Sequence, residues 1–359
     1  MNRVYFDNAA TTCVTEPVLQ EALPYLTGYY GNPSSTHHMG TVAKNAIVEA
    51  RLKCAKAINA ESEQIFFTSG ATESNNLVTG QGIIISSEYE HPSMRTGFTA
   101  DDIKLEINKL QRAGTRDIIV SHQFVNNEIG TIFDIKEYAK IAHENSCLFH
   151  TDATQAFSHV PVDVKDIDCD FLSLSGHKFH APKGVGLLYI KNPDNFKSSI
   201  VGGGQEKGLR SGTENVFGIV AMGKAMELYN YNPEIEQHYK DLKRIFIQEL
   251  AKRCPVEFHL NQIEGVQHVN NIVNLSFRNI NGESLAALLD YSGFCVSTGS
   301  ACHSASLEES EVIKTLRLPK EYRLGSIRVS FSEENTVEEV ERLVDATVKH
   351  ISTLMTINK

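Results

Sequence analysis

A lysine that follows a strand-like run in the middle of the chain is a candidate nucleophile. The segment Ser173–Gly184 reads SLSGHKFHAPKG and places Lys178 just beyond an apolar run. Burial in a crevice lowers the pKa of an ammonium group, which frees the amine to form a Schiff base. The same segment would also suit a surface lysine in a loop rich in Gly and Pro, so a second feature is needed.

Two further features follow other strand-like runs. Asp152 comes after the apolar run Cys147–Phe149, where a carboxylate either caps a helix or meets a cation such as a protonated pyridine nitrogen. Residues 69–72 (SGAT) are a bare turn or a phosphate site at a helix N-terminus. Phosphate anchor, carboxylate and lysine, in this order, form the set that a pyridoxal phosphate enzyme needs. The P-loop and dinucleotide-binding glycine motifs are absent from the sequence.

Six segments in this order resemble the cysteine desulfurase family. This family is a branch of the class V aminotransferases of pyridoxal phosphate fold-type I, and the resemblance is to its housekeeping iron–sulfur type. It extends from residues 5–12 (YFDNAATT) to the C-terminal helix. The segments are SGATESN (69–75), VNNEIG (125–130), DATQ (152–155), SGHK (175–178), GGGQEKGLRSGT (202–213) and STGSACHSAS (297–306).

The resemblance implies a site for pyridoxal 5'-phosphate. Lys178 would hold the cofactor as a Schiff base, Asp152 would pair with its ring nitrogen, and His91 would stack on the ring and exchange protons with the substrate. Thr213 would reach the phosphate of the neighbouring subunit, which implies a homodimer. The remaining cofactor contacts implied are those to ring substituents and phosphate from Ala71, Thr72, Asn127, Gln155, Ser175 and His177.

The resemblance also implies the reaction. L-cysteine would become L-alanine, with Arg328 and Asn127 binding the substrate and Cys302 taking the sulfur as a persulfide. The small polar residues around Cys302 have no apolar period, which predicts a loop that can carry the thiol to a partner. That partner would be a sulfur-acceptor protein, either an iron–sulfur scaffold or a thiolation carrier. Two alternatives stay open: a related lyase or transaminase that uses the same cofactor, and a degenerate scaffold without catalysis.

Strand-like runs alternate with helical patterns over about 150 residues. This alternation predicts an α/β fold with a mostly parallel, doubly wound sheet in a large domain, residues 13–230. Residues 1–12 and 231–359 would form a smaller α+β domain. The strands expected are 64–69, 82–87, 117–123, 146–153, 170–174, 186–190, 271–277 and 327–331, and the main helices are 39–59, 101–112, 134–145, 233–253, 283–291 and one from 336.

Two intervals are short for the family. His91 follows Thr72 by 19 positions and precedes Asn127 by 36. Residues 92–100 (PSMRTGFTA) have no helical period and only one adjacent pair of β-forming residues. We therefore predict a loop there and a sheet one strand shorter than the family's. Residues 82–87 would form its edge, covered by a loop of the same chain or by another molecule.

Composition limits the remaining classes. The 359 residues carry a net charge of −10, so general binding to nucleic acid is not expected. No apolar run approaches the roughly 18 residues that span a bilayer, and no signal pattern begins the chain, which predicts a cytoplasmic protein without membrane contact. No CxxC pair occurs, so neither disulfides nor a metal site is expected. Apart from Cys302, the cysteines are expected in the core: Cys13, Cys54, Cys147, Cys169, Cys254 and Cys295.

Overall fold

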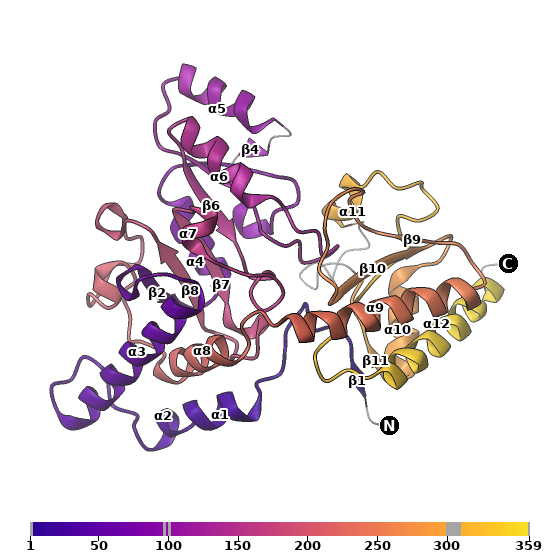
Figure 1. Cartoon of the computed structure of the whole chain (residues 1–359), viewed down its shortest axis with the longest axis horizontal. Helices are drawn as coiled ribbons and strands as arrows, with labels where there is room; N and C mark the ends of the chain where they lie inside the picture. Colours follow the sequence, from indigo (N-terminus) through magenta and orange to yellow (C-terminus); the bar gives the residue numbers. More distant parts are fainter. Residues whose placement is uncertain (1–2, 96–97, 100–101, 299–309, 358–359) are drawn as a thin grey trace. The chain divides into compact units, whose positions relative to one another are not determined.

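The chain forms two compact units in a computed structural model that describes residues 3–95, 98–99, 102–298 and 310–357 (Figure 1). The large unit comprises Thr12–Phe124 and Phe133–Tyr231. The small unit comprises Met1–Thr11, Val125–Ile132 and Asn232–Lys359. The division expected from the sequence, 13–230 against 1–12 and 231–359, differs mainly at residues 125–132, which make their contacts in the small unit.

A seven-stranded sheet organises the large unit. Its strand order is β2-β8-β7-β6-β5-β3-β4, and β8 runs antiparallel to both of its neighbours while the other pairings are parallel. The mostly parallel sheet predicted from the sequence is therefore confirmed. The strands are β2 (Ile65–Thr68), β3 (Ile83–Ser86), β4 (Phe98–Thr99), β5 (Ile118–Ser121), β6 (Leu148–Asp152), β7 (Phe171–Ser175) and β8 (Gly186–Ile190).

The helices of the large unit connect these strands. Asp102 and Asp134 cap α5 and α6, because each carboxylate accepts a hydrogen bond from an N–H group of the first turn. Helix α8 packs against α3, where a Cβ on Gly223 would lie 2.8 Å from the Cα of Ala50. The helices are α1 (Glu16–Ala22), α2 (Pro24–Thr27), α3 (His38–Ala57), α4 (Ala71–Thr79), α5 (Ile103–Arg112), α6 (Ile135–Glu144), α7 (Val164–Ile167) and α8 (Val216–Leu228).

The predicted loop over residues 92–100 is wrong. Phe98 and Thr99 form β4, which pairs in parallel with Ile85 and Ser86 of β3. The edge of the sheet is therefore the two-residue strand β4. Without β4, backbone groups on one side of β3 would stay unpaired. Phe98 and Thr99, the adjacent pair of β-forming residues in this segment, provide their partners. Before it, Pro92–Met94 forms a single 3-10 turn that buries Met94 in the core.

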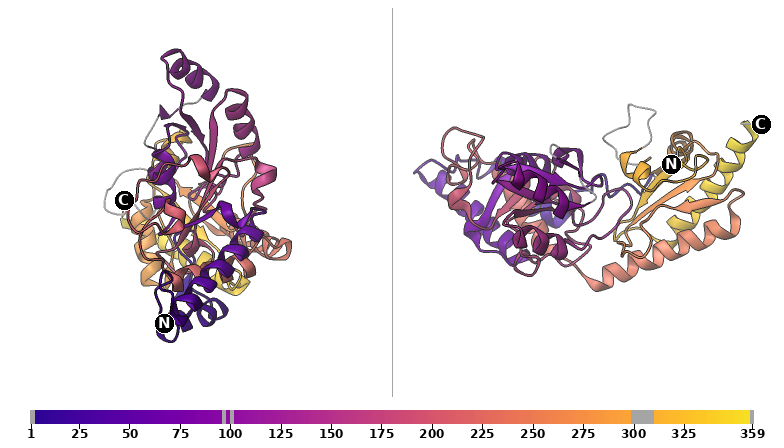
Figure 2. Two further views of the ribbon diagram at one scale, coloured as in Figure 1. Left: turned by 90° about the vertical axis from the view of Figure 1, so that its left-hand side faces the viewer. Right: turned by 90° about the horizontal axis from the view of Figure 1, so that it is seen from above.

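The small unit contains an antiparallel three-stranded sheet in the order β12-β10-β9 and a parallel pair of β1 with β11. The two long helices α9 and α12 pack against each other, and the right-hand view of Figure 2 shows them in salmon and yellow. No helix within the described residues is long and apolar enough to cross a membrane. The elements are β1 (Val4–Tyr5), α9 (Pro233–Arg253), β9 (Phe258–Leu260), β10 (Ile272–Phe277), α10 (Gly282–Tyr291), β11 (Phe294–Cys295), α11 (Glu311–Thr315), β12 (Ser326–Ser330) and α12 (Val337–Ile357).

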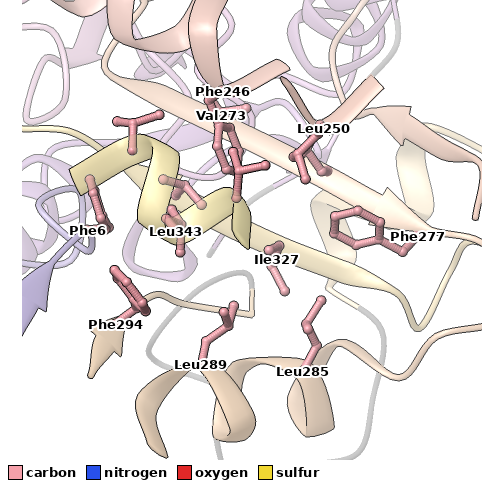
Figure 3. Close-up of a cluster of buried hydrophobic side chains, with 14 of the residues drawn as sticks. Phe6, Phe246, Leu250, Val273, Phe277, Leu285, Leu289, Phe294, Ile327 and Leu343 are labelled. Carbon is pink, nitrogen blue, oxygen red and sulfur yellow. The ribbon is translucent and has the colours of Figure 1, made fainter. Parts of the chain in front are cut away.

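One hydrophobic cluster holds the small unit together (Figure 3). Phe246 of α9 is fully buried and meets Phe331 edge to face at 6.4 Å between ring centroids. Leu285 and Leu289 point from α10 toward Ile327 of β12. Phe6, close to the N-terminus, stacks on Phe294 next to the pairing of β1 with β11. The first residues of the chain thus complete a core built mainly by its last third.

The segment Val125–Ile132 is bound to the small unit by hydrogen bonds from distant residues. The Asn274 amide donates to the carbonyl of Glu128, and Val269 N–H donates to the carbonyl of Gly130. Ile132 N–H donates to the carbonyl of Gln267, and Gly130 adopts a positive φ of 70°. The position of Asn127 is therefore fixed by the small unit.

Candidate active site

The turn between β2 and α4 has the geometry of an anion site. Gly70 has a φ of 155°, and α4 begins at the next residue without a side-chain cap. The first N–H groups of a helix have no partner within the helix and can bind an anion. A Cβ on Gly186 would lie 2.5 Å from the Cα of Gly70, and one on Gly70 would lie 3.5 Å from Ser175 Oγ. The start of α4, with Ala71 and Thr72, therefore lies next to Ser175. The family resemblance implies a phosphate at these residues.

Asp152 is a buried carboxylate at the carboxyl end of β6, and only 7% of its surface is exposed. Its Oδ2 accepts a hydrogen bond of 2.9 Å from Asn75 Nδ2, and its Oδ1 accepts one of 3.0 Å from Thr154 N–H. Both donors are neutral. A cation placed next to Asp152 would therefore be stabilised by the negative charge of the carboxylate. Gln155, also buried, follows on the same segment.

Lys178 ends a short 3-10 turn directly after β7. Its turn is held by Thr12, whose N–H and Oγ1 both donate to the carbonyl of His177. Thr12 Oγ1 in turn accepts from His180 N–H at 2.8 Å. On its other side, a Cβ on Gly176 would lie 2.9 Å from the Cβ of Ala181. The lysine is therefore carried by a closely packed turn beside the strand that ends at Asp152, because β6 and β7 are paired.

His177 is neutral at pH 7. Burial and the positive charges of Lys178 and Lys183 lower the pKa of its imidazole to about 4. A neutral imidazole next to these lysines can donate one hydrogen bond to an anion without the cost of desolvating an ionic pair.

His91 lies at the start of the 3-10 turn Pro92–Met94. Its Nδ1 is 2.7 Å from Ser93 Oγ and accepts a hydrogen bond of 3.2 Å from Ser93 N–H. Asn75 donates a hydrogen bond of 2.9 Å to the same Ser93 Oγ, and Asn75 also bonds Asp152. His91 and Asp152, both expected at the cofactor ring, are thus connected through Asn75.

Glu90 is a second buried carboxyl group near Asp152. Its side chain is fully buried, one oxygen accepts a hydrogen bond from Gln123 N–H, and Oε2 has no hydrogen-bond partner. Burial, followed by the negative charge of Asp152, raises the pKa of Glu90 to about 8. At pH 7 Glu90 therefore carries a proton and adds no second negative charge beside Asp152.

Two arginine–glutamate pairs anchor the segment that carries Thr213. Arg210 donates from Nε and Nη2 to the carboxylate of Glu73, in the first turn of α4. Arg51 donates from both terminal nitrogens to Glu206, which is buried and also accepts from Phe67 N–H. Bidentate pairs of this kind fix geometry as well as charge. Thr213 itself lies exposed at the end of this anchored segment.

Arg328 of β12 is the largest fully buried side chain of the small unit. Its Nη1 donates to the carbonyl of Asn127 at 2.7 Å, and its Nη2 donates to Asp7 Oδ1 at 2.9 Å. Its Nε is buried without a hydrogen-bond partner. The structure thus brings two of the expected substrate residues, Arg328 and Asn127, into direct contact.

The cysteines divide differently from the prediction. Cys302, the expected nucleophile, lies outside the described residues. Cys54, Cys147 and Cys169 are buried as predicted, but Cys13 is exposed and Cys254 and Cys295 are half-buried, so the core prediction is wrong for Cys13. Cys13 lies on the loop before α1, where its backbone carbonyl lies 3.0 Å from His180 Nδ1.

Four residues beside the expected ones have no role implied by the sequence motifs: Asn75, Ser93, Glu90 and Asp7. Asn75 stands in the segment SGATESN, and Asp7 stands in YFDNAATT. Their partners lie far along the chain, as for Asp7 and Arg328, which are 321 positions apart. Of these four residues, only Glu90 could have been found from a local pattern, because it directly precedes His91 in the sequence.

Comparison with known proteins agrees with the geometry. The family model described as aminotransferase class V matches residues 4–343. The cysteine desulfurase IscS of Methanosarcina thermophila is 43% identical over 369 aligned positions, which cover 95% of this chain and 90% of that protein. The alignment is longer than the chain itself, so this chain lacks residues that the relative has.

Solved structures show the same fold. A NifS-like protein superposes with a TM-score of 0.86 at 32% identity and covers 98% of this chain and 100% of its own. The structure described as SspA in complex with cysteine has a TM-score of 0.77 at 29% identity and covers 92% of this chain and 99% of its own. With the family model and the full-length relative, these likenesses show that the chain belongs to the class V aminotransferase family and, within it, to the cysteine desulfurases.

Proposed function

We propose that this chain converts L-cysteine to L-alanine with pyridoxal 5'-phosphate and takes the released sulfur on Cys302 as a persulfide. The observation that carries the proposal is the buried Asp152 carboxylate with its two neutral donors, on the strand next to the one that leads to Lys178. The cysteine bound to the SspA structure supports the choice of substrate.

The residues present fit the cofactor. A cationic ring nitrogen would offset the buried charge of Asp152, and the first turn of α4 with Ser175 suits a phosphate. His177, which is neutral at pH 7, would donate a hydrogen bond to that phosphate. Lys178 would hold the cofactor covalently. The other contacts proposed are those of His91, Asn127, Gln155, Ala71 and Thr72, with Thr213 reaching the phosphate of a second copy in a homodimer.

The bound cofactor would supply an electron sink for the pair left on the substrate Cα. The Lys178 amine would accept the Cα proton. Arg328 would bind the substrate carboxylate through N–H groups that Asp7 and the Asn127 carbonyl hold in place.

The sulfur step needs a thiolate. Cys302 would attack the substrate sulfur, so that an S–S bond forms and the Cβ–S bond breaks with its electron pair kept on carbon. That carbon takes up a proton, Lys178 would return a proton to Cα, and the product leaves as L-alanine. The persulfide would then pass to an acceptor protein, an iron–sulfur scaffold or a thiolation carrier, in the cytoplasm. Both the acceptor and the location remain predictions.

Two variants test the proposal. Lys178→Ala should lose both the visible absorption of bound cofactor and the formation of alanine, whereas Lys197→Ala, at an exposed lysine of the same unit, should lose neither. Cys302→Ser should keep the spectral change that cysteine induces but form no persulfide by mass spectrometry. Cys13→Ser serves as its control, because Cys13 is exposed and lies outside the proposed machinery.

Each alternative predicts a different outcome. A related lyase that eliminates sulfide from cysteine would form pyruvate, ammonia and free sulfide instead of alanine, at an unchanged rate in Cys302→Ser. A degenerate scaffold would bind no cofactor and show no absorption in the wild type. Either result would overturn the proposal.

A further inference from the structure

A chain of hydrogen bonds inside the large unit links His91 to Asp152. It runs from Asp152 Oδ2 to Asn75 Nδ2 at 2.9 Å, from Asn75 Nδ2 to Ser93 Oγ at 2.9 Å, and from Ser93 Oγ to His91 Nδ1 at 2.7 Å. Asn75 is fully buried and Asp152 nearly so. The direction of each bond can be deduced from the carboxylate end.

Asp152 fixes the orientation of the Asn75 amide. A carboxylate only accepts hydrogen bonds, so the NH2 group and not the oxygen of Asn75 faces it. The second N–H of the same nitrogen donates to Ser93 Oγ. Asn75 Oδ1 is left buried without a partner, and turning the amide over would only place that oxygen against the carboxylate. Asn75 Oδ1 therefore stays without a hydrogen bond, while Asn75 Nδ2 donates to both Asp152 and Ser93.

Ser93 passes this orientation on to the imidazole. Its Oγ accepts from Asn75, so its own O–H is available to donate to His91 Nδ1 at 2.7 Å. The backbone N–H of Ser93 donates to the same nitrogen at 3.2 Å. Two donors that point at Nδ1 make it an acceptor, and the single proton of a neutral imidazole then resides on Nε2.

We propose that Asn75 and Ser93 are positioning residues that hold neutral His91 as the tautomer with its proton on Nε2. In this state Nε2 offers an N–H and has no lone pair with which to take up a proton. His91 would therefore act on the bound substrate or cofactor as a hydrogen-bond donor, and the base that removes the Cα proton would be Lys178. This assignment deepens the proposed function and rests on it for the identity of the bound groups.

The tautomer can be measured directly. Nitrogen NMR of the holoenzyme labelled with 15N-histidine distinguishes the two ring nitrogens, and His91→Gln identifies the signals by their loss. The wild type should show His91 with the proton on Nε2. Ser93→Ala and Asn75→Ala should each shift the tautomer ratio toward the Nδ1 form by about fivefold, the size expected when one hydrogen bond is lost. Ser93→Thr, which keeps the hydroxyl, should restore the wild-type ratio.

The controls separate positioning from folding and from activity. Asn76→Ala changes the exposed residue that follows Asn75. The Asn76 side-chain amide donates a hydrogen bond to the carbonyl of Thr72, so its loss should leave the His91 signals unchanged. Ser93 is only half-buried, so Ser93→Ala tests the idea even where Asn75→Ala fails to fold. A proton on Nδ1 in the wild type, or equal ratios in the wild type and Ser93→Ala, would overturn the assignment. The NMR measurement needs no turnover, so it tests the tautomer separately from the proposed function. A protein that forms no alanine can still show the proton on Nε2, and a protein that forms alanine can show it on Nδ1.

Discussion

Glu90→Gln should change how the stability of the protein depends on pH. The folded chain keeps the Glu90 proton up to about pH 8, because the side chain is fully buried and Asp152 lies near, while the unfolded chain releases it near 4.5. Between these values the folded state binds one proton more than the unfolded state. The free energy of unfolding therefore falls as pH rises, by about 1.4 kcal/mol per pH unit. Glutamine does not titrate, and its oxygen can still accept from Gln123 N–H.

From pH 6.0 to 7.5 the wild type should thus lose about 2 kcal/mol of stability relative to Glu90→Gln. The assay is urea unfolding at several pH values. It uses cofactor-free protein, because a cation beside Asp152 would weaken the effect. Glu88→Gln is the matched control, since Glu88 is exposed two positions earlier, and its curve should follow that of the wild type. Parallel curves for the wild type and Glu90→Gln would refute the claim that folded Glu90 holds a proton at pH 7.

Two further predictions concern the small unit. Asp7→Ala should raise the KM for L-cysteine about tenfold with unchanged cofactor absorption, because it removes a charge-assisted hydrogen bond of roughly 1.5–3 kcal/mol that holds Arg328; steady-state kinetics with an unaltered KM would mean that Asp7 does not position this guanidinium for substrate. Phe246→Ala should lower the free energy of unfolding by about 3–5 kcal/mol, because the ring is fully buried between α9 and the sheet. Val266→Ala, at an exposed position, should cost far less in the same denaturation series, and equal losses would contradict the packing argument.

The sequence predicted the strands whose ends carry polar residues, because a buried parallel strand leaves a continuous apolar run such as IIVS in β5. It missed α8, whose sequence VFGIVAMGKAMEL is apolar around most of its surface and therefore has no helical period. It also missed β4, because two residues are too few for any pattern. Helix α8 is stabilised by its packing against α3, and β4 by its backbone pairing with β3, so neither depends on local sequence preference.

The candidate site shows the same division. Lys178, Asp152 and the turn before α4 were visible as residue types at strand ends. The bond of Asn75 with Ser93 and the pair of Asp7 with Arg328 join residues from different elements, so no local pattern encodes them. The assignment of residues 125–132 to the small unit likewise depends on Asn274 and Val269, which lie more than a hundred positions later.

The small unit's assembly from three separate stretches of chain has a consequence for biosynthesis. During translation, β1 emerges long before its partner β11, which follows about 290 positions later. Val125–Ile132 likewise emerges before the residues to which it is hydrogen-bonded. The large unit can complete its sheet while the ribosome still holds the C-terminal third. Until the strands and helices of the last third have been made, Phe6 and its apolar neighbours remain without their core and are exposed in the nascent chain.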